Sequence, residues 1–254
     1  MLKVNIIGIG PGNPDLLTGA ARQAIAESNI LIGDKRMLSA FAENEKMLYY
    51  TIRTSDIVEI AAKADPAKDV IAVLVSGDVG FFSLAKTISG KLPECECVRY
   101  VGISSLVYFA GRLNMSWDDA KIVSMHGRNQ NLVAAVAQNK KVFSLTGGDN
   151  SAQLLCAQLC EHGLGKVQVY VGENLSYPEE KITSGTAEEI GALQFPSLSV
   201  MMILNEEAQP FTPTVHGLAD DLFMRSKVPM TKQEVRSVSM SKLMPKPTDL
   251  IYDI

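Results

Sequence analysis

Long apolar segments and a secretory leader are both missing from this 254-residue chain. The longest unbroken apolar stretches, such as 70–75, are about six residues long, far short of the roughly 18 that a transmembrane helix needs. No basic segment followed by an apolar one comes after Met1, as a secretory leader would require. We therefore predict a cytoplasmic protein without a membrane partner.

An excess of basic residues is also missing. The sequence has 24 Lys and Arg against 28 Asp and Glu, a formal net charge of −4. Nucleic-acid binding normally shows as an excess of Lys and Arg, so this balance argues against nucleic acid as the main partner but leaves room for a local cationic pocket. Because 46% of the residues are hydrophobic, the composition supports a real core and excludes a disordered chain.

Cysteine is scarce as well, with four residues at positions 95, 97, 156 and 160. Cys95 and Cys97 precede a predicted strand, and Cys156 and Cys160 lie one helical turn apart. Neither pair has the loop spacing that is usual for a zinc site, so we predict reduced thiols and no metal.

What the sequence does contain is an alternation of short apolar strands with helical patterns. This alternation predicts an α/β fold with largely parallel sheets. The polar segment 113–118 is a candidate hinge, so we expect domains at 1–114 and 115–204, followed by a linker and tail at 205–254. Strands are predicted at 3–9, 30–32, 70–75, 97–100, 121–124, 141–145, 167–171 and 198–204, and helices at 16–27, 55–64, 81–92, 105–113, 131–137, 151–162 and 186–192.

The tail has a different pattern. Pro210 and Pro213 indicate a linker. Thr231 followed by Glu234 predicts a capping box that opens a helix ending near 243. Residues 249–254 then have the pattern of a strand that is cut off as it begins.

Glycine-rich and polar turns follow several of the predicted strands, where ligands bind in open α/β sheets. The first, Gly8-Ile9-Gly10-Pro11-Gly12, could belong to a dinucleotide site, but Pro11, Pro14 and Asp15 stand where that motif has the glycine opening its helix. The others contain Ser76-Gly77-Asp78, Gly102-Ile103-Ser104-Ser105, Ser124-Met125-His126-Gly127-Arg128, Thr146-Gly147-Gly148 and Gly172-Glu173-Asn174. Asp78 and Ser104 could cap helices, bind a ligand, or do both.

Residues 1–204 resemble the tetrapyrrole methylases, which use S-adenosylmethionine, through the turns at 8–18, 76–78 and 103–105 and the two-domain spacing. Within that family the chain is similar to the C-5 methyltransferases of cobalamin synthesis. This second likeness rests on Gly33-Asp34-Lys35-Arg36, Trp117-Asp118-Asp119-Ala120, Ser124-Met125-His126-Gly127-Arg128 and Glu173-Asn174-Leu175.

The resemblance implies two α/β domains with the ligand cleft between them, a homodimer, and methylation at C-5 of precorrin-7 or its cobalt form. Arg36, Arg112 and Arg128 are expected to hold the carboxylates of the tetrapyrrole, since Arg pairs with carboxylates in a bidentate way. His126 or Glu173 would remove the proton that methylation displaces. S-adenosylmethionine, leaving as S-adenosylhomocysteine, would lie against Ile9, Gly10, Pro11, Gly77, Asp78, Val79, Ser104, Ser105, Met125 and Thr146.

The tail carries a resemblance of its own. Segments 227–232 and 249–254 are similar to the opening of a C-15 methyltransferase and decarboxylase, a fused or separate partner, but the chain stops before the glycine loop of such an enzyme. We expect 205–254 to begin a second enzyme without C-15 activity. Alternatives for the whole chain are methylation at another tetrapyrrole position or of another substrate, such as a diphthine precursor or ribosomal RNA, and an inactive scaffold that binds S-adenosylmethionine.

Overall fold

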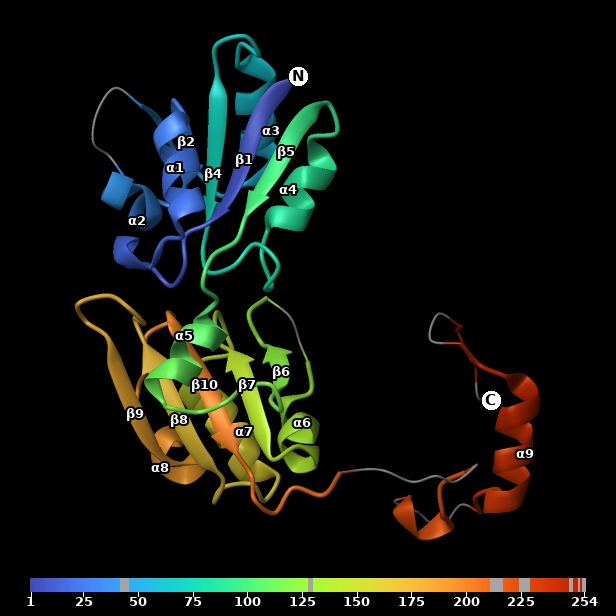
Figure 1. Ribbon diagram of the computed structural model, residues 1–254. Coiled ribbons are helices and arrows are strands. Elements are labelled where there is room, and N and C mark those ends of the chain that lie inside the picture. The colour runs from blue at the N-terminus through green and yellow to red at the C-terminus, as the bar shows by residue number, and fades with distance from the viewer. Residues whose placement is uncertain are drawn as a thin grey trace. The chain divides into compact units, whose positions relative to one another are not determined.

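The computed structural model describes residues 1–41, 46–127, 130–210, 217–223, 229–246, 249–250 and 252, and it divides the chain into two compact units, Met1–Gln209 and Pro210–Ile254 (Figure 1). The larger unit holds two five-stranded sheets, each with helices against it. The predicted α/β fold with two sheets is thereby confirmed. The domain boundary between residues 114 and 115 stays a prediction.

The first sheet has the strand order β3-β2-β4-β1-β5, and all of its neighbouring strands run parallel. Helices α1 (Gly19–Glu27) and α2 (Lys35–Leu38) cover one face. Helices α3 (Thr54–Lys63) and α4 (Ala85–Lys91) cover the other. The exposed edge strand β3 escaped sequence prediction because only one of its four side chains is even partly buried. The strands are β1 (Leu2–Gly8), β2 (Ile30–Gly33), β3 (Met47–Tyr50), β4 (Val70–Val75) and β5 (Cys95–Tyr100).

The second sheet, with the order β6-β7-β10-β8-β9, corrects the expectation that both sheets are largely parallel. Only β6 and β7 run parallel, whereas β10 is antiparallel to both β7 and β8, and β8 is antiparallel to β9. The unpredicted strand β9 explains the error: it reverses the chain after a connection too short for a crossover helix. The strands are β6 (Lys121–Ser124), β7 (Lys141–Leu145), β8 (Gln168–Glu173), β9 (Lys181–Thr186) and β10 (Ser199–Leu204).

Each predicted helix is present, although two begin later than expected. The segment predicted as a helix from residue 16 starts with the 3-10 turn η1 (Pro14–Leu16) and becomes α-helical only after Thr18, whose hydroxyl caps α1. The predicted helix at 81–92 shortens to α4 because residues 81–84 form a turn in which Phe82 has a φ of +49°. The helices are α1 (Gly19–Glu27), α2 (Lys35–Leu38), α3 (Thr54–Lys63), α4 (Ala85–Lys91), α5 (Ser105–Arg112), α6 (Leu132–Gln138), α7 (Ala152–Glu161), α8 (Ala187–Gly191) and α9 (Gln233–Leu243), with a further 3-10 turn, η2 (Ser39–Phe41).

Helix α5 lies against the second sheet, on the face opposite α6, α7 and α8. Its Leu106 and Phe109 are buried with Phe143 of β7 and Met202 of β10. Burying a side chain of this size contributes roughly 1.5–3 kcal/mol, so this cluster ties the chain that leaves the first sheet firmly onto the second. Phe81, which follows β4, packs on the same cluster with its ring centroid 6.1 Å from that of Phe143.

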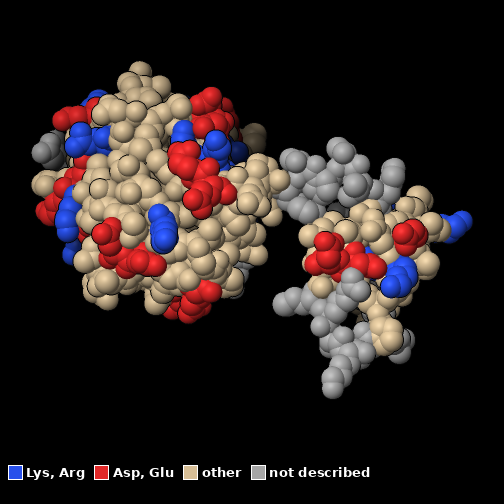
Figure 2. Space-filling view, turned by 90° about the horizontal axis from the view of Figure 1, so that it is seen from below, with Lys and Arg blue, Asp and Glu red and all other residues tan. Residues whose placement is uncertain are grey.

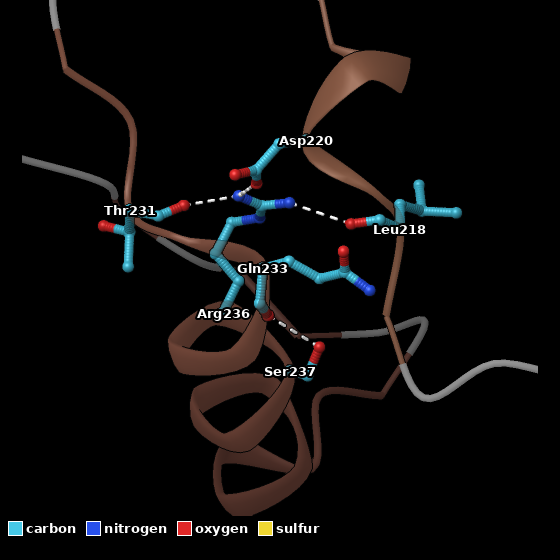
Figure 3. Close-up of polar contacts among 6 residues, drawn as sticks. All are labelled: Leu218, Asp220, Thr231, Gln233, Arg236 and Ser237. Carbon is cyan, nitrogen blue, oxygen red and sulfur yellow. Dashed lines mark hydrogen bonds and ion pairs between the residues drawn. The ribbon is translucent and has the colours of Figure 1, made fainter.

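The smaller unit contains the 3-10 turn η3 (Asp220–Leu222) and helix α9 (Figure 3). Arg236 of α9 joins them: its Nη1 donates to Asp220 Oδ1 at 2.6 Å and to the Thr231 carbonyl, and its Nη2 donates to the Leu218 carbonyl at 2.8 Å. The predicted helix is thus confirmed, but the predicted capping box is wrong. The N-cap is Lys232, one residue later, and its side chain makes no capping hydrogen bond.

Within the described residues, no helix has both the length and the apolar character needed to cross a membrane. Figure 2 shows one face of the larger unit, on which acidic and basic side chains are interspersed. Of the strand predicted at 249–254, residues 251, 253 and 254 lie outside the described part of the chain, and residues 249, 250 and 252 are not in a strand.

Candidate active site

A pocket of about 240 Å³ lies where the strand ends of the first sheet face the second sheet. Turns after six strands contribute to it, three from each sheet, and the described residues that line it include one titratable group, His126. Five of the residues predicted from the sequence meet here. They are Pro11, Gly77, Ser105, His126 and Thr146.

Glycine backbones form the first sheet's side of this region. Gly10 and Gly77 pair as an isolated bridge, with Gly10 N donating to Gly77 O at 3.1 Å and Gly77 N donating to Gly10 O at 2.9 Å. A Cβ on Gly102 would lie 2.3 Å from Gly77 O and 2.5 Å from Gly8 O, closer than real Cβ atoms come. The turns after β1, β4 and β5 are therefore in direct backbone contact, which only glycine allows at these positions. Together they form a wall of peptide groups against which a ligand can lie.

Asp78 joins two of these turns. Its Oδ1 accepts from Gly80 N at 2.8 Å, and its Oδ2 accepts from Gly102 N at 3.1 Å. Asp78 and Ser104 line a separate hollow next to Trp117, rather than the pocket between the sheets. Ser104 also caps α5, because its Oγ accepts from Val107 N at 3.2 Å. Asp78 thus holds the turn after β4 against the turn after β5.

His126 and Thr146 supply the polar side chains of the second sheet. His126 Nδ1 lies 3.3 Å from the Thr146 carbonyl oxygen. A carbonyl oxygen only accepts, so this contact requires the hydrogen on Nδ1 and leaves Nε2 of the neutral ring as an acceptor. The ring also rests on Gly147, where a Cβ would lie 2.2 Å from Nδ1. Thr146 is itself fixed, since its hydroxyl donates to Ser199 O at 2.6 Å.

Glu173, the other predicted proton acceptor, ends β8 but does not line the pocket. Residues alternate between the faces of a strand, so Glu173 belongs with Val169 and Val171, which pack towards α7 and α8, while Gly172 lines the pocket. Glu173 is 8% exposed, and its Oε1 has no hydrogen-bond partner. The Lys181 ammonium lies 3.8 Å away, which is beyond hydrogen-bond distance.

The three predicted arginines are placed differently. Arg36 lies on α2 with its guanidinium 5.3 Å from the centroid of the Tyr177 ring. Arg112, at the end of α5, donates from Nε to Glu180 Oε1 at 2.7 Å. Arg128 lies outside the described residues. Neither Arg36 nor Arg112 therefore lines the pocket between the sheets.

The side chains of three further predicted residues are buried in the cores and do not line the pocket. Ile9 is buried in the core between the first sheet and α1, and Val79 in the core on the opposite face. Met125 is 5% exposed and packs with α6 and α7, while its carbonyl accepts from Asn150 Nδ2 at 2.9 Å.

Sequence reasoning missed one side of the pocket. Ser197, Leu198, Ser199 and Val200 line it at the start of β10, and Phe81 and Phe82 line it from the turn after β4. The prediction placed ligand contacts only after strands, which is correct where strands run parallel. Because β10 is antiparallel to its neighbours, its first residues lie at the pocket, and the polar Ser197 before an apolar strand is the one signal that could have indicated this.

The four cysteines are free thiols, and none lines the pocket. Burial raises the pKa of Cys156 to about 12 and also raises the pKa of Cys95, Cys97 and Cys160. All four are therefore protonated and weakly nucleophilic at neutral pH.

Residues 3–191 match the family of Tetrapyrrole (Corrin/Porphyrin) Methylases. The chain belongs to this family. It is 30% identical over 213 residues to a probable cobalt-precorrin-7 C(5)-methyltransferase of Methanocaldococcus jannaschii, covering 80% of this chain and 99% of that protein. It is also 28% identical over 257 residues to the precorrin-6Y C(5,15)-methyltransferase [decarboxylating] of a Sinorhizobium species, covering 99% of this chain but only 61% of that protein.

Solved structures show the tetrapyrrole methylase fold. The precorrin-6Y methylase of cobalamin biosynthesis from Archaeoglobus fulgidus superimposes with a TM-score of 0.61 at 18% identity, over 80% of this chain and 97% of that one. The uroporphyrin-III C-methyltransferase of Thermus thermophilus, complexed with S-adenosylhomocysteine, superimposes with a TM-score of 0.66 at 19% identity, over 79% of this chain and 96% of that one. As a tetrapyrrole methylase the chain is a methyltransferase, and the pocket between its sheets is the candidate place for methyl transfer.

Proposed function

We propose that this tetrapyrrole methylase transfers a methyl group from S-adenosylmethionine to C-5 of precorrin-7 or its cobalt form. The observation that carries the proposal is the pocket between the sheets: six strand-end turns meet there, and His126 is the one titratable group among the described residues lining it. Such a site positions reactants in a dry cavity. The relatives named as C-5 methyltransferases favour this position of the ring.

The residues present fit S-adenosylmethionine. Gly8, Gly77 and Gly102 approach one another so closely that a Cβ on Gly8 or Gly102 would clash with backbone atoms of the facing turns. The turns therefore present peptide groups to a ligand. Beside these turns, Phe81, Leu145, Leu175 and Val200 offer apolar surface, and Ser105 and Thr146 offer hydroxyls. When bound, S-adenosylmethionine supplies a methyl group that is electrophilic towards a carbon of the macrocycle. Pro11, Gly77, Ser105 and Thr146 would hold it directly, with Ile9, Gly10, Val79 and Met125 contributing through the backbone and Asp78 and Ser104 through the turns that they fix.

The chain's own residues then have three tasks. The glycine turns orient the bound groups, and the apolar side chains exclude water. His126 Nε2 takes up the proton displaced from the methylated carbon, because Nδ1 is held by the Thr146 carbonyl. Glu173 is the second candidate for that proton, supported by an Oε1 without a hydrogen-bond partner. Arg36 and Arg128 are proposed to hold carboxylates of the tetrapyrrole.

Mass spectrometry tests this reaction. Purified protein is incubated with S-adenosylmethionine and either precorrin-7 or cobalt-precorrin-7, with a reaction lacking S-adenosylmethionine as control. We expect the gain of one methyl group without loss of carbon dioxide, and fragmentation should place it at C-5. Methylation at another ring carbon would support a neighbouring specificity instead, and tight binding of S-adenosylhomocysteine without turnover of either substrate would support an inactive scaffold.

For residues after 209 we propose that they correspond to the opening of a C-15 methyltransferase and decarboxylase. The match to the Sinorhizobium relative supports this, since it extends over 99% of the chain, beyond the family match at 3–191. The same mass spectra test the proposal, because the chain alone should produce neither a second methylation nor decarboxylation. A homodimer and a cytoplasmic location are further proposals, the first of which light scattering of the purified chain can test.

A further inference from the structure

The segment 174–180, which joins β8 to β9, contacts the glycine turn of the first sheet. Asn13 N donates to Ser176 Oγ at 2.9 Å. Gly12 has a φ of +143°, and a Cβ on it would lie 2.1 Å from the Tyr177 ring. Asn174 and Ser176 have φ values of +45° and +69°, which are costly for residues other than glycine. The segment is therefore held in a demanding conformation that places Tyr177 on the turn.

Tyr177 in turn supports Arg36. The Arg36 Cζ lies over the Tyr177 ring, 5.3 Å from its centroid, and the guanidinium donates no hydrogen bond to a described residue, which leaves its N–H groups available. Arg36 forms no ion pair with any described residue. It is also the one charged side chain among the described residues around a pocket of about 500 Å³. That pocket is lined by Gly12, Asn13, Pro14, Arg36, Ser39, Ala40, Ser176, Tyr177 and Pro178.

Glu180 anchors the other end of the segment. Its Oε2 accepts from Ser176 N at 2.6 Å and from the Tyr108 hydroxyl at 2.7 Å, and its Oε1 accepts from Arg112 Nε at 2.7 Å. Burial raises the pKa of Glu180, but these three donors outweigh burial and the pKa lies below its ordinary value. Glu180 therefore stays ionised and fixes Ser176 to α5. The contact also accounts for Arg112, whose guanidinium forms an ion pair with Glu180.

We propose that Arg36 and Tyr177 form a carboxylate-binding subsite, for which Glu180 is a positioning residue. The subsite deepens the proposed function, on which its assignment to a tetrapyrrole side chain rests. Pro11 lines the pocket between the sheets and Gly12 lines this one, so consecutive residues of one turn separate the two pockets. A macrocycle that lies beside the cofactor in the first pocket can extend a carboxylate arm past this turn to the second. A planar guanidinium with free in-plane donors matches a carboxylate in a bidentate way.

Kinetics with cobalt-precorrin-7 test the subsite. Arg36→Gln should raise KM for the tetrapyrrole about tenfold, the effect of about 1.4 kcal/mol of lost binding. Its kcat and the Kd of S-adenosylhomocysteine should stay within about twofold, because the subsite does not touch the reacting atoms. Arg36→Lys should lie between Arg36→Gln and the wild type, since Lys keeps the charge but not the planar fork. Arg53→Gln, at an exposed arginine of the same domain, is the matched control and should leave all three values unchanged.

The positioning role has its own variants. Tyr177→Leu removes the ring under Arg36 and should raise KM for the tetrapyrrole about twofold to fivefold, since a cation–π contact contributes roughly 0.5–1 kcal/mol. Tyr177→Phe keeps the ring and should restore wild-type KM. Glu180→Gln should raise KM in the same direction as Tyr177→Leu and leave kcat unchanged. A merely structural role would instead lower kcat or weaken S-adenosylhomocysteine binding together with the rise in KM.

Binding of uroporphyrin III, an octacarboxylate tetrapyrrole, separates this proposal from the proposed function because it needs no turnover. Porphyrin fluorescence titrations should show about tenfold weaker binding for Arg36→Gln than for wild type and Arg53→Gln. If wild type does not methylate cobalt-precorrin-7 but porphyrin binding depends on Arg36, the proposed function fails and the subsite stands. If wild type is active and Arg36→Gln changes neither KM nor porphyrin binding by more than about twofold, the subsite is overturned.

Discussion

The two sheets of the larger unit contribute to the pocket in different ways. The all-parallel first sheet contributes glycine turns that touch one another at Gly8, Gly77 and Gly102. It also contributes the side chains of Phe81 and Phe82. The mixed second sheet presents side chains, among them His126, Thr146 and Leu175. We expect the first sheet to shape the site through its touching turns and the second to supply the titratable group, His126. Substitutions in each sheet should therefore fail in different ways.

The largest effect is expected in the second sheet. His126→Ala should lower kcat by about 10²–10⁴, the usual contribution of a positioned proton acceptor, while the Kd of S-adenosylhomocysteine changes little. Methyl transfer measured with the radiolabelled methyl group tests this. His162→Ala is the matched control, because His162 is exposed at the end of α7. A His126→Ala enzyme with wild-type kcat would exclude His126 as the proton acceptor and leave Glu173 as the candidate.

In the first sheet, the backbone contact itself is the target. Gly102→Ala should destabilise the protein by about 1–3 kcal/mol, because the new methyl group would meet two backbone oxygens within 2.5 Å. Calorimetry should also show weakened S-adenosylhomocysteine binding. Gly111→Ala is the control: nothing lies within 4 Å of a Cβ there, and α5 should gain about 0.5–1 kcal/mol in thermal denaturation. Equal changes in stability and in S-adenosylhomocysteine binding for Gly102→Ala and Gly111→Ala would contradict the role of the backbone contact at Gly102.

Asp78 tests whether the turns need to be held together. Asp78→Ala removes the acceptor for Gly80 N and Gly102 N, and S-adenosylhomocysteine should bind at least about tenfold more weakly, a loss of about 1.4 kcal/mol. Asp78→Asn keeps one oxygen acceptor and should recover part of the affinity. Unchanged affinity of Asp78→Ala in calorimetry would remove Asp78 from the site.

The smallest effect is expected at Glu180, which holds the segment 174–180 that contacts the first sheet, and it depends on pH. The pKa of Glu180 is below its ordinary value of 4.5, because hydrogen bonds from Ser176, Tyr108 and Arg112 outweigh burial. Its contribution to stability is therefore fully present above pH 4.5 and is lost as the pH falls through the lower pKa of the folded state. Denaturation of the wild type from pH 7 to pH 3 should show this loss, of about 1 kcal/mol. Glu180→Gln should show a flatter dependence over the same range, and parallel curves would contradict the anchoring role.

The sequence predicted the pocket residues that follow parallel strands better than those near the antiparallel strands β9 and β10. Where strands run parallel, the turns after apolar runs together with the family resemblance predicted Pro11, Gly77, Ser105 and Thr146, which line the pocket. It was not enough for Ser199 and Val200, because β9 is polar and partly exposed and its reversal of the chain leaves no hydrophobic signal. Glu180 and Tyr177 were also missed. Their roles depend on contacts between segments 72 and 165 residues apart in the chain, which no local pattern records.

The close packing of Gly12 under the Tyr177 ring has a consequence for engineering. Any side chain at position 12 would occupy the space of that ring, whose atoms lie 2.1–2.3 Å from the place that a Cβ would take. In a combinatorial library, positions 12 and 177 should therefore behave as a single coupled position. Variants with a larger residue at 12 should survive selection mainly when residue 177 has become small. These variants would lack the ring that contacts Arg36 and would have more open space beside the turn.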